Sequence, residues 1–241
     1  MVTFDFGLSM WTGRPVAEEI AIRLELSLQV AIMASIIAVL IAIPMGTLSA
    51  LFKDTWIDYA IRLFTISGLA MPSFWLGMLM ILLFSVRLGW LPVIGNGGVL
   101  PLVLPVGTLG IWLSVPLQRL VRDGLLESLH EPYVTTLRAK GLGERRIFYV
   151  HVLRNAVTST ITLLGVMVGE SLSNAVIIET LFARQGIGRT TVEAIGQKDV
   201  PVVQGAILIS SVAYVIVNLL VDLSYTLIDP RTRLVVSKGT R

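Results

Sequence analysis

The chain has 241 residues, of which 54% are hydrophobic and only 15% are charged, and its formal net charge is +3. Soluble domains carry charges at roughly a quarter of their positions, so the composition excludes an ordinary soluble protein, and the small net charge argues against a nucleic-acid binder. The absence of cysteine excludes disulfides, thiolate metal sites and cysteine nucleophiles. The first residues lack the basic start of a secretory signal. We expect an integral membrane protein.

Five apolar runs follow one another, and each is long enough to cross about 30 Å of hydrocarbon as an α-helix. The runs are Ser27–Phe52, Leu63–Val86, Val99–Leu120, Ala156–Phe182 and Val202–Ile228. Helices are expected because lipid offers the backbone no hydrogen-bond partner, and because the runs lack the short alternating pattern of barrel strands. We therefore expect an all-α fold with an external segment over residues 1–26, a transmembrane domain over 27–228 and a cytoplasmic tail over 229–241.

Prolines interrupt several of these runs. They are Pro44, Pro72, Pro105 and Pro116. Each removes a backbone donor and tends to kink its helix. Irregular packing explains any one of them, whereas several together favour a moving transport pathway over a simple anchor.

The positions of Lys and Arg predict the orientation, since basic loops stay in the cytoplasm. If successive segments alternate in side, thirteen basic residues fall on one side and six on the other. The thirteen are Lys53, Arg62, Arg119, Arg122, Arg138, Lys140, Arg145, Arg146, Arg154, Arg231, Arg233, Lys238 and Arg241. The six are Arg14, Arg23, Arg87, Arg184, Arg189 and Lys198. The C-terminus is therefore expected in the cytoplasm and the N-terminus outside, which suggests that a first helix is missing upstream of Met1.

A charged segment, about residues 121–155, lies between the third and fourth runs, and its centre reads YVTTLRAKGLGERRIFYVHVLRNA. The apolar positions predict one helix over Leu125–Lys140 and a second over Glu144–Leu153, with Gly141 and Gly143 forming a turn between them. The alternative is a solvated loop held at the lipid headgroups by its basic side chains.

Polar residues also lie inside the fourth run, at Glu170, Ser171, Ser173 and Asn174. A carboxylate at this depth costs a few kcal/mol or more, so it should face a water-filled cavity or a partner. Glu170, Ser173 and Asn174 either line a pathway that meets a cationic group, such as a peptide amino terminus, or form hydrogen bonds between helices. Neither His130 nor His151 has a second ligand nearby in the sequence, so we expect no metal site.

The order of residues in the charged segment resembles the cytoplasmic coupling segment of ATP-binding-cassette importer permeases, in the version of the dipeptide, oligopeptide and nickel branch. The residues that carry the resemblance are Arg138-Ala139-Lys140-Gly141-Leu142 and Glu144-Arg145-Arg146. The general family pattern has a Glu-Ala-Ala start where this chain has Thr135-Thr136-Leu137. Further blocks resemble the B-type permease of this branch, namely TGRPVAEEIAIRL, LAMPSFWLGMLMILLFSVRLGWLP, ETLFARQGIGRTTVEAIGQKDVPVVQGAIL and NLLVDLSYTLIDPRTR.

The resemblance implies a type I importer permease fold of six transmembrane helices, of which five would be present here, and no catalytic residue. The ATPase-coupling residues would be Tyr133, Arg138, Ala139, Lys140, Gly141, Leu142, Glu144, Arg145 and Arg146. The implied partners are two ATP-binding subunits that hold ATP and magnesium, a second permease of the C type, and an extracytoplasmic substrate-binding protein. The substrates would be short peptides or related small solutes, imported across the cytoplasmic membrane of a prokaryote.

Two other classes of function are weighed against this interpretation. The chain has no GxxxxGK[ST] phosphate loop, so ATP must be handled by another chain. An intramembrane enzyme is disfavoured because the sequence has no HExxH and no GxSG with a partner His in a span. A self-sufficient channel or secondary transporter is the alternative, but it would leave the charged segment without a partner, and inverted repeats are not evident.

Overall fold

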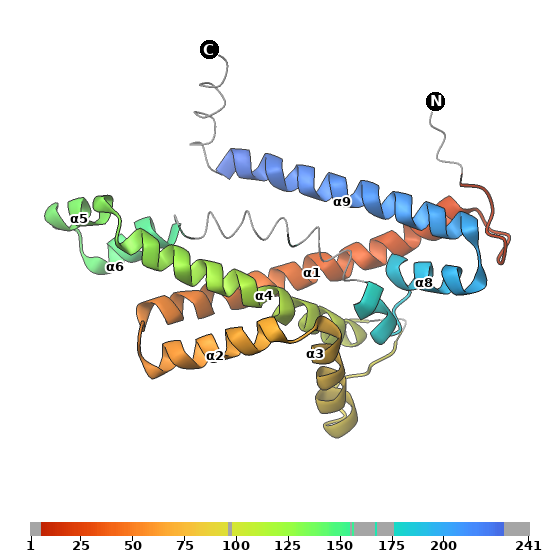
Figure 1. The fold of residues 1–241 in the computed structure, drawn as a ribbon, viewed down its shortest axis with the longest axis horizontal. Helices are drawn as coiled ribbons and strands as arrows, with labels where there is room; N and C mark the ends of the chain where they lie inside the picture. Colours follow the sequence, from red (N-terminus) through yellow and green to blue (C-terminus); the bar gives the residue numbers. More distant parts are fainter. Residues whose placement is uncertain (1–5, 96–97, 155, 157–166, 168–175, 229–241) are drawn as a thin grey trace, which may run out of the picture. The chain divides into compact units, whose positions relative to one another are not determined.

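A computed structural model describes residues 6–95, 98–154, 156, 167 and 176–228 (Figure 1). The elements are α1 (Val16–Leu51), α2 (Trp56–Ala70), α3 (Ser73–Met80), the π-helix η1 (Ile81–Arg87), α4 (Leu100–Leu129), α5 (Pro132–Ala139), α6 (Glu144–Arg146), the π-helix η2 (Ile147–Val152), α8 (Ile187–Gln197) and α9 (Val200–Ile228). Residues 176–181 are also helical. Over these described ranges the chain forms no β-strand, and the expected all-α class is confirmed for them.

Three of the described helices are long and apolar enough to cross a membrane: α1, α4 and α9 over Val200–Leu220. The segments Trp56–Ala70 and Ser73–Arg87 pass the same test only as a pair. The run Leu63–Val86 is therefore divided between two helices bent by 110°, with the break at the proline where a kink is expected. Pro72 interrupts it, because this residue has no amide hydrogen and its extended backbone (φ −61°, ψ 146°) precedes α3. Most of the fourth apolar run lies outside the described residues.

α1 begins at Val16, well before the start expected at Ser27. The added turns are charged, and their charges suit a helix. Glu18 and Glu19 lie in the first turn, where the helix dipole favours negative charge, and Arg23 pairs with Glu19 at 2.7 Å one turn later. The expected external segment over residues 1–26 therefore contains helix.

The helix expected over Leu125–Lys140 is wrong, because it is divided between two elements. α4 continues to Leu129, and α5 begins at Pro132. Glu131 has an extended backbone (φ −69°, ψ 143°), as a residue before proline prefers, and Pro132 takes the first helical position, where no amide hydrogen is needed. The second helix, expected over Glu144–Leu153, is present as α6 followed by η2.

The chain forms two compact units, residues 1–37, 71–112 and 168–217 in the first and 38–70, 113–167 and 218–241 in the second. The core of the first unit is Val16, Ile20, Ile187, Ala194, Val202 and Ala206. The core of the second is Ala50, Val121, Leu125, Val134, Ile147, Phe148, Val152 and Ala156. In the second unit a side chain at Gly46 would approach Val121 Cβ to 2.7 Å, so glycine permits α1 and α4 to pack closely there.

α9 exposes large apolar side chains along its length. They are Ile207, Leu208, Val212, Val215, Ile216, Leu219, Leu220 and Leu223. An apolar face of this size is unusual in a soluble monomer and is expected where a helix meets lipid. The α9 ribbon is the long blue helix of Figure 1.

Candidate functional site

Glycine builds the turn between α5 and α6. Gly141 has a φ of +78°, in the left-handed region that glycine enters without a steric penalty. The Gly141 amide donates to the Arg138 carbonyl at 2.9 Å, and the Leu142 amide donates to the Leu137 carbonyl at 3.2 Å. These two bonds form a Schellman motif, which satisfies the last carbonyls of α5. The turn that the sequence predicts at Gly141 is present.

An ion pair spans this turn. Arg138 Nε donates to Glu144 Oε1 at 2.7 Å, and Arg138 Nη2 donates to Glu144 Oε2 at 3.1 Å. The Arg138 guanidinium lowers the pKa of the Glu144 carboxyl from its ordinary value, so the pair is charged at neutral pH. Both side chains are exposed, and such a pair adds little to stability. What the pair does is fix the directions in which the two charged groups point.

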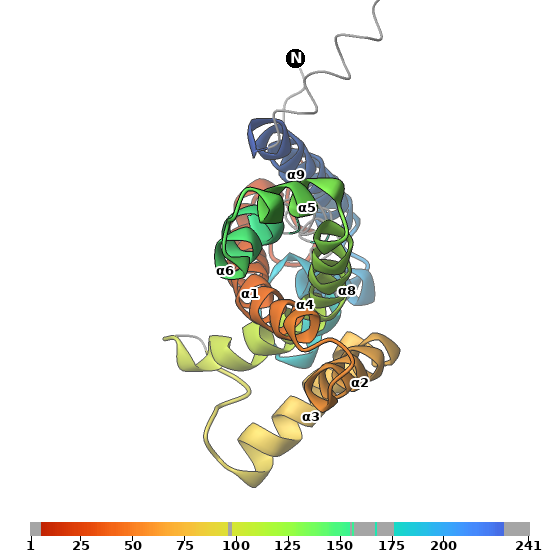
Figure 2. The same ribbon diagram turned by 90° about the vertical axis from the view of Figure 1, so that its left-hand side faces the viewer.

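The apolar side of this segment is buried against the helices of its own unit. Val134 of α5 and Ile147, Phe148 and Val152 of η2 belong to the same buried cluster as Val121 and Leu125 of α4. Each buried Val, Ile or Phe side chain contributes about 1.5–3 kcal/mol relative to an exposed one. The segment is therefore attached to the end of α4, and Figure 2 shows the chain passing from α4 through α5 to α6.

Most of the predicted coupling residues lie on the outer side of the segment. The exposed ones are Arg138, Ala139, Lys140, Gly141, Glu144, Arg145 and Arg146. Tyr133 and Leu142 are partly buried and pack against the cluster, so they attach the segment. The structure thus brings the nine residues together at one end of α4 and divides them between two sides.

Sequence reasoning missed a buried polar group at the junction of α1, α2 and α4. The Asp58 carboxylate, which is fully buried, accepts from Arg122 Nε at 3.0 Å and from Arg122 Nη2 at 2.9 Å. Ser49 Oγ donates to Asp58 Oδ1 at 2.5 Å and accepts from Arg122 Nε at 3.0 Å. We call Ser49, Asp58 and Arg122 the polar clamp. Arg122 was counted in the sequence only as one of the basic residues that set orientation.

The candidate pathway residues Glu170, Ser173 and Asn174 lie outside the described residues. Another carboxylate of the same expected span, Glu179, is described and is buried. It accepts from the backbone amides of Gly188 at 2.9 Å and Arg189 at 3.2 Å, at the N-terminus of α8, and from the hydroxyl of Ser27 on α1. Gly186, at the N-cap of α8, has no side chain that could accept from the first amides of the helix. The Glu179 carboxylate takes this role, although it lies outside α8.

A second carboxylate holds the loop that precedes α1. Asp199 accepts from Ser9 Oγ at 2.5 Å and from the amides of Met10 at 3.2 Å and Trp11 at 3.4 Å. Burial disfavours its charged form, but these hydrogen bonds outweigh burial and hold the pKa of Asp199 below its ordinary value. A lowered pKa stabilises the attachment above the ordinary value of the carboxyl, so protonation releases the loop only in acid, below about pH 4.

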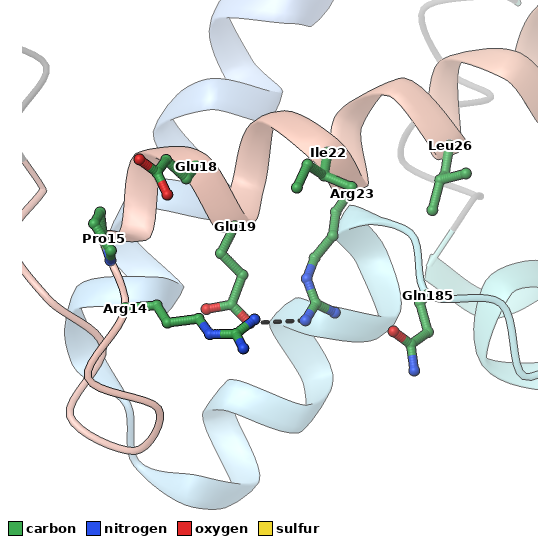
Figure 3. A pocket seen from close by; sticks show the side chains of 8 residues that line it. All are labelled: Arg14, Pro15, Glu18, Glu19, Ile22, Arg23, Leu26 and Gln185. Atoms are coloured by element: carbon green, nitrogen blue, oxygen red, sulfur yellow. Dashed lines mark hydrogen bonds and ion pairs between the residues drawn. The ribbon is translucent and has the colours of Figure 1, made fainter.

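A cavity of about 190 Å³ lies beside this loop. Its lining residues are Arg14, Pro15, Glu18, Glu19, Ile22, Arg23, Leu26 and Gln185, drawn in Figure 3. Arg23 is bound on one side by Glu19 and donates to the Thr190 hydroxyl at 2.7 Å. The lining therefore mixes charges of both signs. In the described part of the chain, no three His, Asp or Glu side chains are arranged to hold a metal ion.

Comparison with known proteins connects this geometry to transport. Residues 42–234 match the sequence profile of the binding-protein-dependent transport system inner membrane component. A Brucella abortus (strain 2308) protein that carries the name peptide transport system permease protein is 37% identical over 238 residues, which cover 95% of this chain and 76% of that one. The glutathione transport system permease protein of Escherichia coli (strain K12) is 38% identical over 229 residues, covering 95% and 75%.

Two solved structures share the fold. A chain of the methionine ABC transporter MetNI in an inward-facing conformation superposes with a TM-score of 0.70 at 15% identity, covering 88% of this chain and 97% of that one. A chain of an amino acid ABC transporter superposes with a TM-score of 0.62 at 16% identity, covering 89% and 94%. At these identities the likeness shows the fold alone, and it confirms the expected fold class.

Proposed function

Because the chain belongs to the family of binding-protein-dependent transport system inner membrane components, we propose that Tyr133–Arg146 is the element through which a separate ATPase subunit drives this permease. The chain is a multi-pass inner-membrane permease subunit of an ABC importer, and ATP hydrolysis belongs to another subunit. The segment from α5 to α6 has an apolar side that is buried against α4 and an opposite side that is charged and exposed. That two-sided arrangement is the observation that carries the proposal.

The exposed side suits an acidic partner surface. Lys140, Arg145 and Arg146 supply three cations, and none of them has an ion pair among the described residues. Arg138 is the one basic residue here whose charge is already matched, by Glu144. Free cations on a rigid helix-turn-helix give an incoming subunit both steering and register. ATP and magnesium would be bound by that subunit.

The composition of the assembly is part of the proposal. Two ATP-binding subunits would drive a pair of permeases, this chain and a C-type partner, and an extracytoplasmic binding protein would deliver the substrate. The excess of basic residues in the charged segment and the tail supports a cytoplasmic location for both, including the C-terminus.

We also propose that the substrates are short peptides or peptide-like solutes. The support is the naming of the relatives, which are a peptide and a glutathione transport permease. Within the membrane, Glu170, Ser173 and Asn174 would line the pathway and meet the amino terminus of the substrate. An uptake assay with peptides that carry a free or an acetylated amino terminus tests this role. In the variant Glu170→Gln, uptake of peptides with a free amino terminus should exceed uptake of acetylated peptides by less than it does in the unmodified protein. An unchanged difference would mean that these residues serve helix packing.

A photocrosslinking experiment tests the docking proposal. Since the chain has no cysteine, the variant Ala139→Cys offers one thiol, on the exposed side of α5, for attachment of a benzophenone maleimide. After irradiation of the assembled transporter, we expect a crosslink between position 139 and the ATPase subunit. The matched control is the variant Thr12→Cys with the same label, at an exposed residue of the loop before α1, and it should give no crosslink to the ATPase subunit.

Two results would contradict the proposal. A crosslink from position 12 but not from position 139 would place the ATPase at the N-terminal end of α1, away from the proposed docking element. Failure of position 139 to react with a thiol reagent added from the cytoplasmic side would overturn the orientation.

A further inference from the structure

The polar clamp lies at the point where α4 meets two different neighbours. On α4, Val121 and Leu125 flank Arg122 in sequence and are fully buried in the cluster that attaches the coupling segment. Arg122 itself points to α1 and α2, where it binds Ser49 and Asp58. One short stretch of α4 therefore contacts the coupling segment and Ala50 of α1 through apolar side chains, and it contacts the α1–α2 corner through hydrogen bonds as well.

Close helix packing surrounds the clamp. One turn before Ser49 on α1, a side chain at Gly46 would approach the carbonyl oxygen of Gln118 to 2.8 Å. On α2, a side chain at Gly68 would approach Val115 Cγ2 to 2.7 Å. Between these positions the hydroxyl of Thr65 donates to the side-chain oxygen of Gln118. The three helices are thus in close contact on both sides of the ion pair, with little freedom to slide.

Stability alone is a weak reason for such an arrangement. Burying an ion pair costs desolvation energy that roughly cancels its attraction, and apolar side chains of similar volume are often equally stabilising. The clamp does something that an apolar contact does not, because its four hydrogen bonds are directional and fix the rotation of α4 about its axis. When the end of α4 is displaced, a helix held in this way transmits the displacement to α1 and α2 and does not rotate about its own axis.

We propose that Asp58 and Arg122 are positioning residues of the transport cycle. Through the clamp, α2, the end of α4 and the end of α1 that carries Ser49 move as one body when an ATPase subunit displaces the coupling segment. The proposal rests on the coupling role of Tyr133–Arg146. It predicts that loss of the clamp separates ATP hydrolysis from transport, because the end of α4 can then turn about its axis against α1 and α2.

Three variants test it in the assembled transporter reconstituted in vesicles: Asp58→Asn, Arg122→Gln and the double variant. ATP hydrolysis and substrate uptake are measured on the same vesicles, and substrate moved per ATP should fall by about threefold to tenfold. Since the two residues act as a pair, the double variant should be no worse than either single one. Arg122→Lys keeps the charge but loses the two-pronged geometry, so it should give an intermediate ratio.

A matched control lies on the same helix. Arg119 and Asp123 form an ion pair at 3.7 Å in which both side chains are exposed. The variant Arg119→Gln removes a positive charge from α4 and leaves the clamp in place, together with the contact between Arg122 and Asp123 at 3.4 Å. Its ratio of transport to hydrolysis should therefore equal that of the unmodified protein.

Several outcomes decide the matter. If the variants lower the amount of assembled transporter but leave substrate moved per ATP unchanged, the clamp is a structural brace and the proposal is wrong. Additive losses in the double variant would also overturn it. A single variant leaves Asp58 with Arg62 at 3.9 Å, or Arg122 with Asp123 at 3.4 Å, in place of its main partner. If a single variant fails to accumulate for that reason, the double variant, which removes both charges of the clamp, carries the decision.

The crosslink from position 139 separates this proposal from the one it rests on. If the unmodified protein gives no crosslink to the ATPase, the coupling role fails. If the crosslink forms in all variants and the ratio does not change, only the role of the clamp fails.

Discussion

Replacing Gly141 with valine should lower transport about tenfold, because a β-branched residue in the left-handed conformation costs on the order of 1–2 kcal/mol or more. Nothing lies within 4 Å of the position that a side chain at Gly141 would take, so the penalty comes from the backbone and not from a clash. The turn would open, and α6 would lose its fixed direction relative to α5. Transport and ATPase binding are measured, together with the amount of protein in the membrane, which should not change.

Two further variants at this turn make the prediction specific. Gly143 has a φ of −67° and also has open space around it, so Gly143→Ala should leave transport unchanged. Asparagine enters the left-handed region more readily than other residues with a side chain, so Gly141→Asn should retain more transport than Gly141→Val. Equal losses at both glycines would mean that the segment needs small residues for contact and not for backbone conformation.

Replacing Glu179 with alanine should lower the unfolding temperature of the purified protein by about 5–15 °C. The substitution leaves the amides of Gly188 and Arg189 and the hydroxyl of Ser27 without their acceptor in a buried site. Each buried group that loses its partner costs about 1–3 kcal/mol. α8 would lose the acceptor at its N-terminus.

A second substitution, at the N-cap of α8, should destabilise the protein in the same way, and a third serves as a control. A side chain at Gly186 would overlap the Glu179 carboxylate, so Gly186→Ala should destabilise the protein to a similar degree. Glu193, on the exposed side of α8, forms one ion pair among the described residues, with Arg189 at 2.7 Å, so Glu193→Ala should shift the unfolding temperature by little. If Glu179→Ala and Glu193→Ala behave alike in a thermal unfolding assay, the buried carboxylate does not hold α8.

Hydrophobic runs in the sequence predict α4 and α9 well, because the length of hydrocarbon to be crossed sets a minimum number of apolar residues. They do not predict where a helix ends. α1 extends through a charged stretch whose side chains pair along the helix surface, and the second run breaks at Pro72 although its hydropathy is continuous. Hydropathy reports preference for lipid, whereas helix ends depend on capping and on backbone geometry.

The candidate site divides in the same way. The turn at Gly141 was predictable because glycine enters the left-handed region without a steric penalty, and that preference is local. The polar clamp was not, since Asp58 and Arg122 are 64 residues apart and nothing local marks them as partners. The position of Arg122 close to the end of an apolar run could have indicated a partner. A charged side chain near the lipid costs free energy unless an oppositely charged group lies close to it.

α1 is much longer than one crossing of the hydrocarbon requires. The helix has 36 residues, about 54 Å, yet about 20 residues suffice to cross the hydrocarbon. All four of its ionisable side chains lie between Glu18 and Glu25. Charged side chains are costly inside hydrocarbon, so we expect the rest of α1, after Glu25, to cross the membrane. In the loop before α1, Met10 and Trp11 are 74% and 70% exposed, so two large apolar side chains are open to contact at the charged end of this helix.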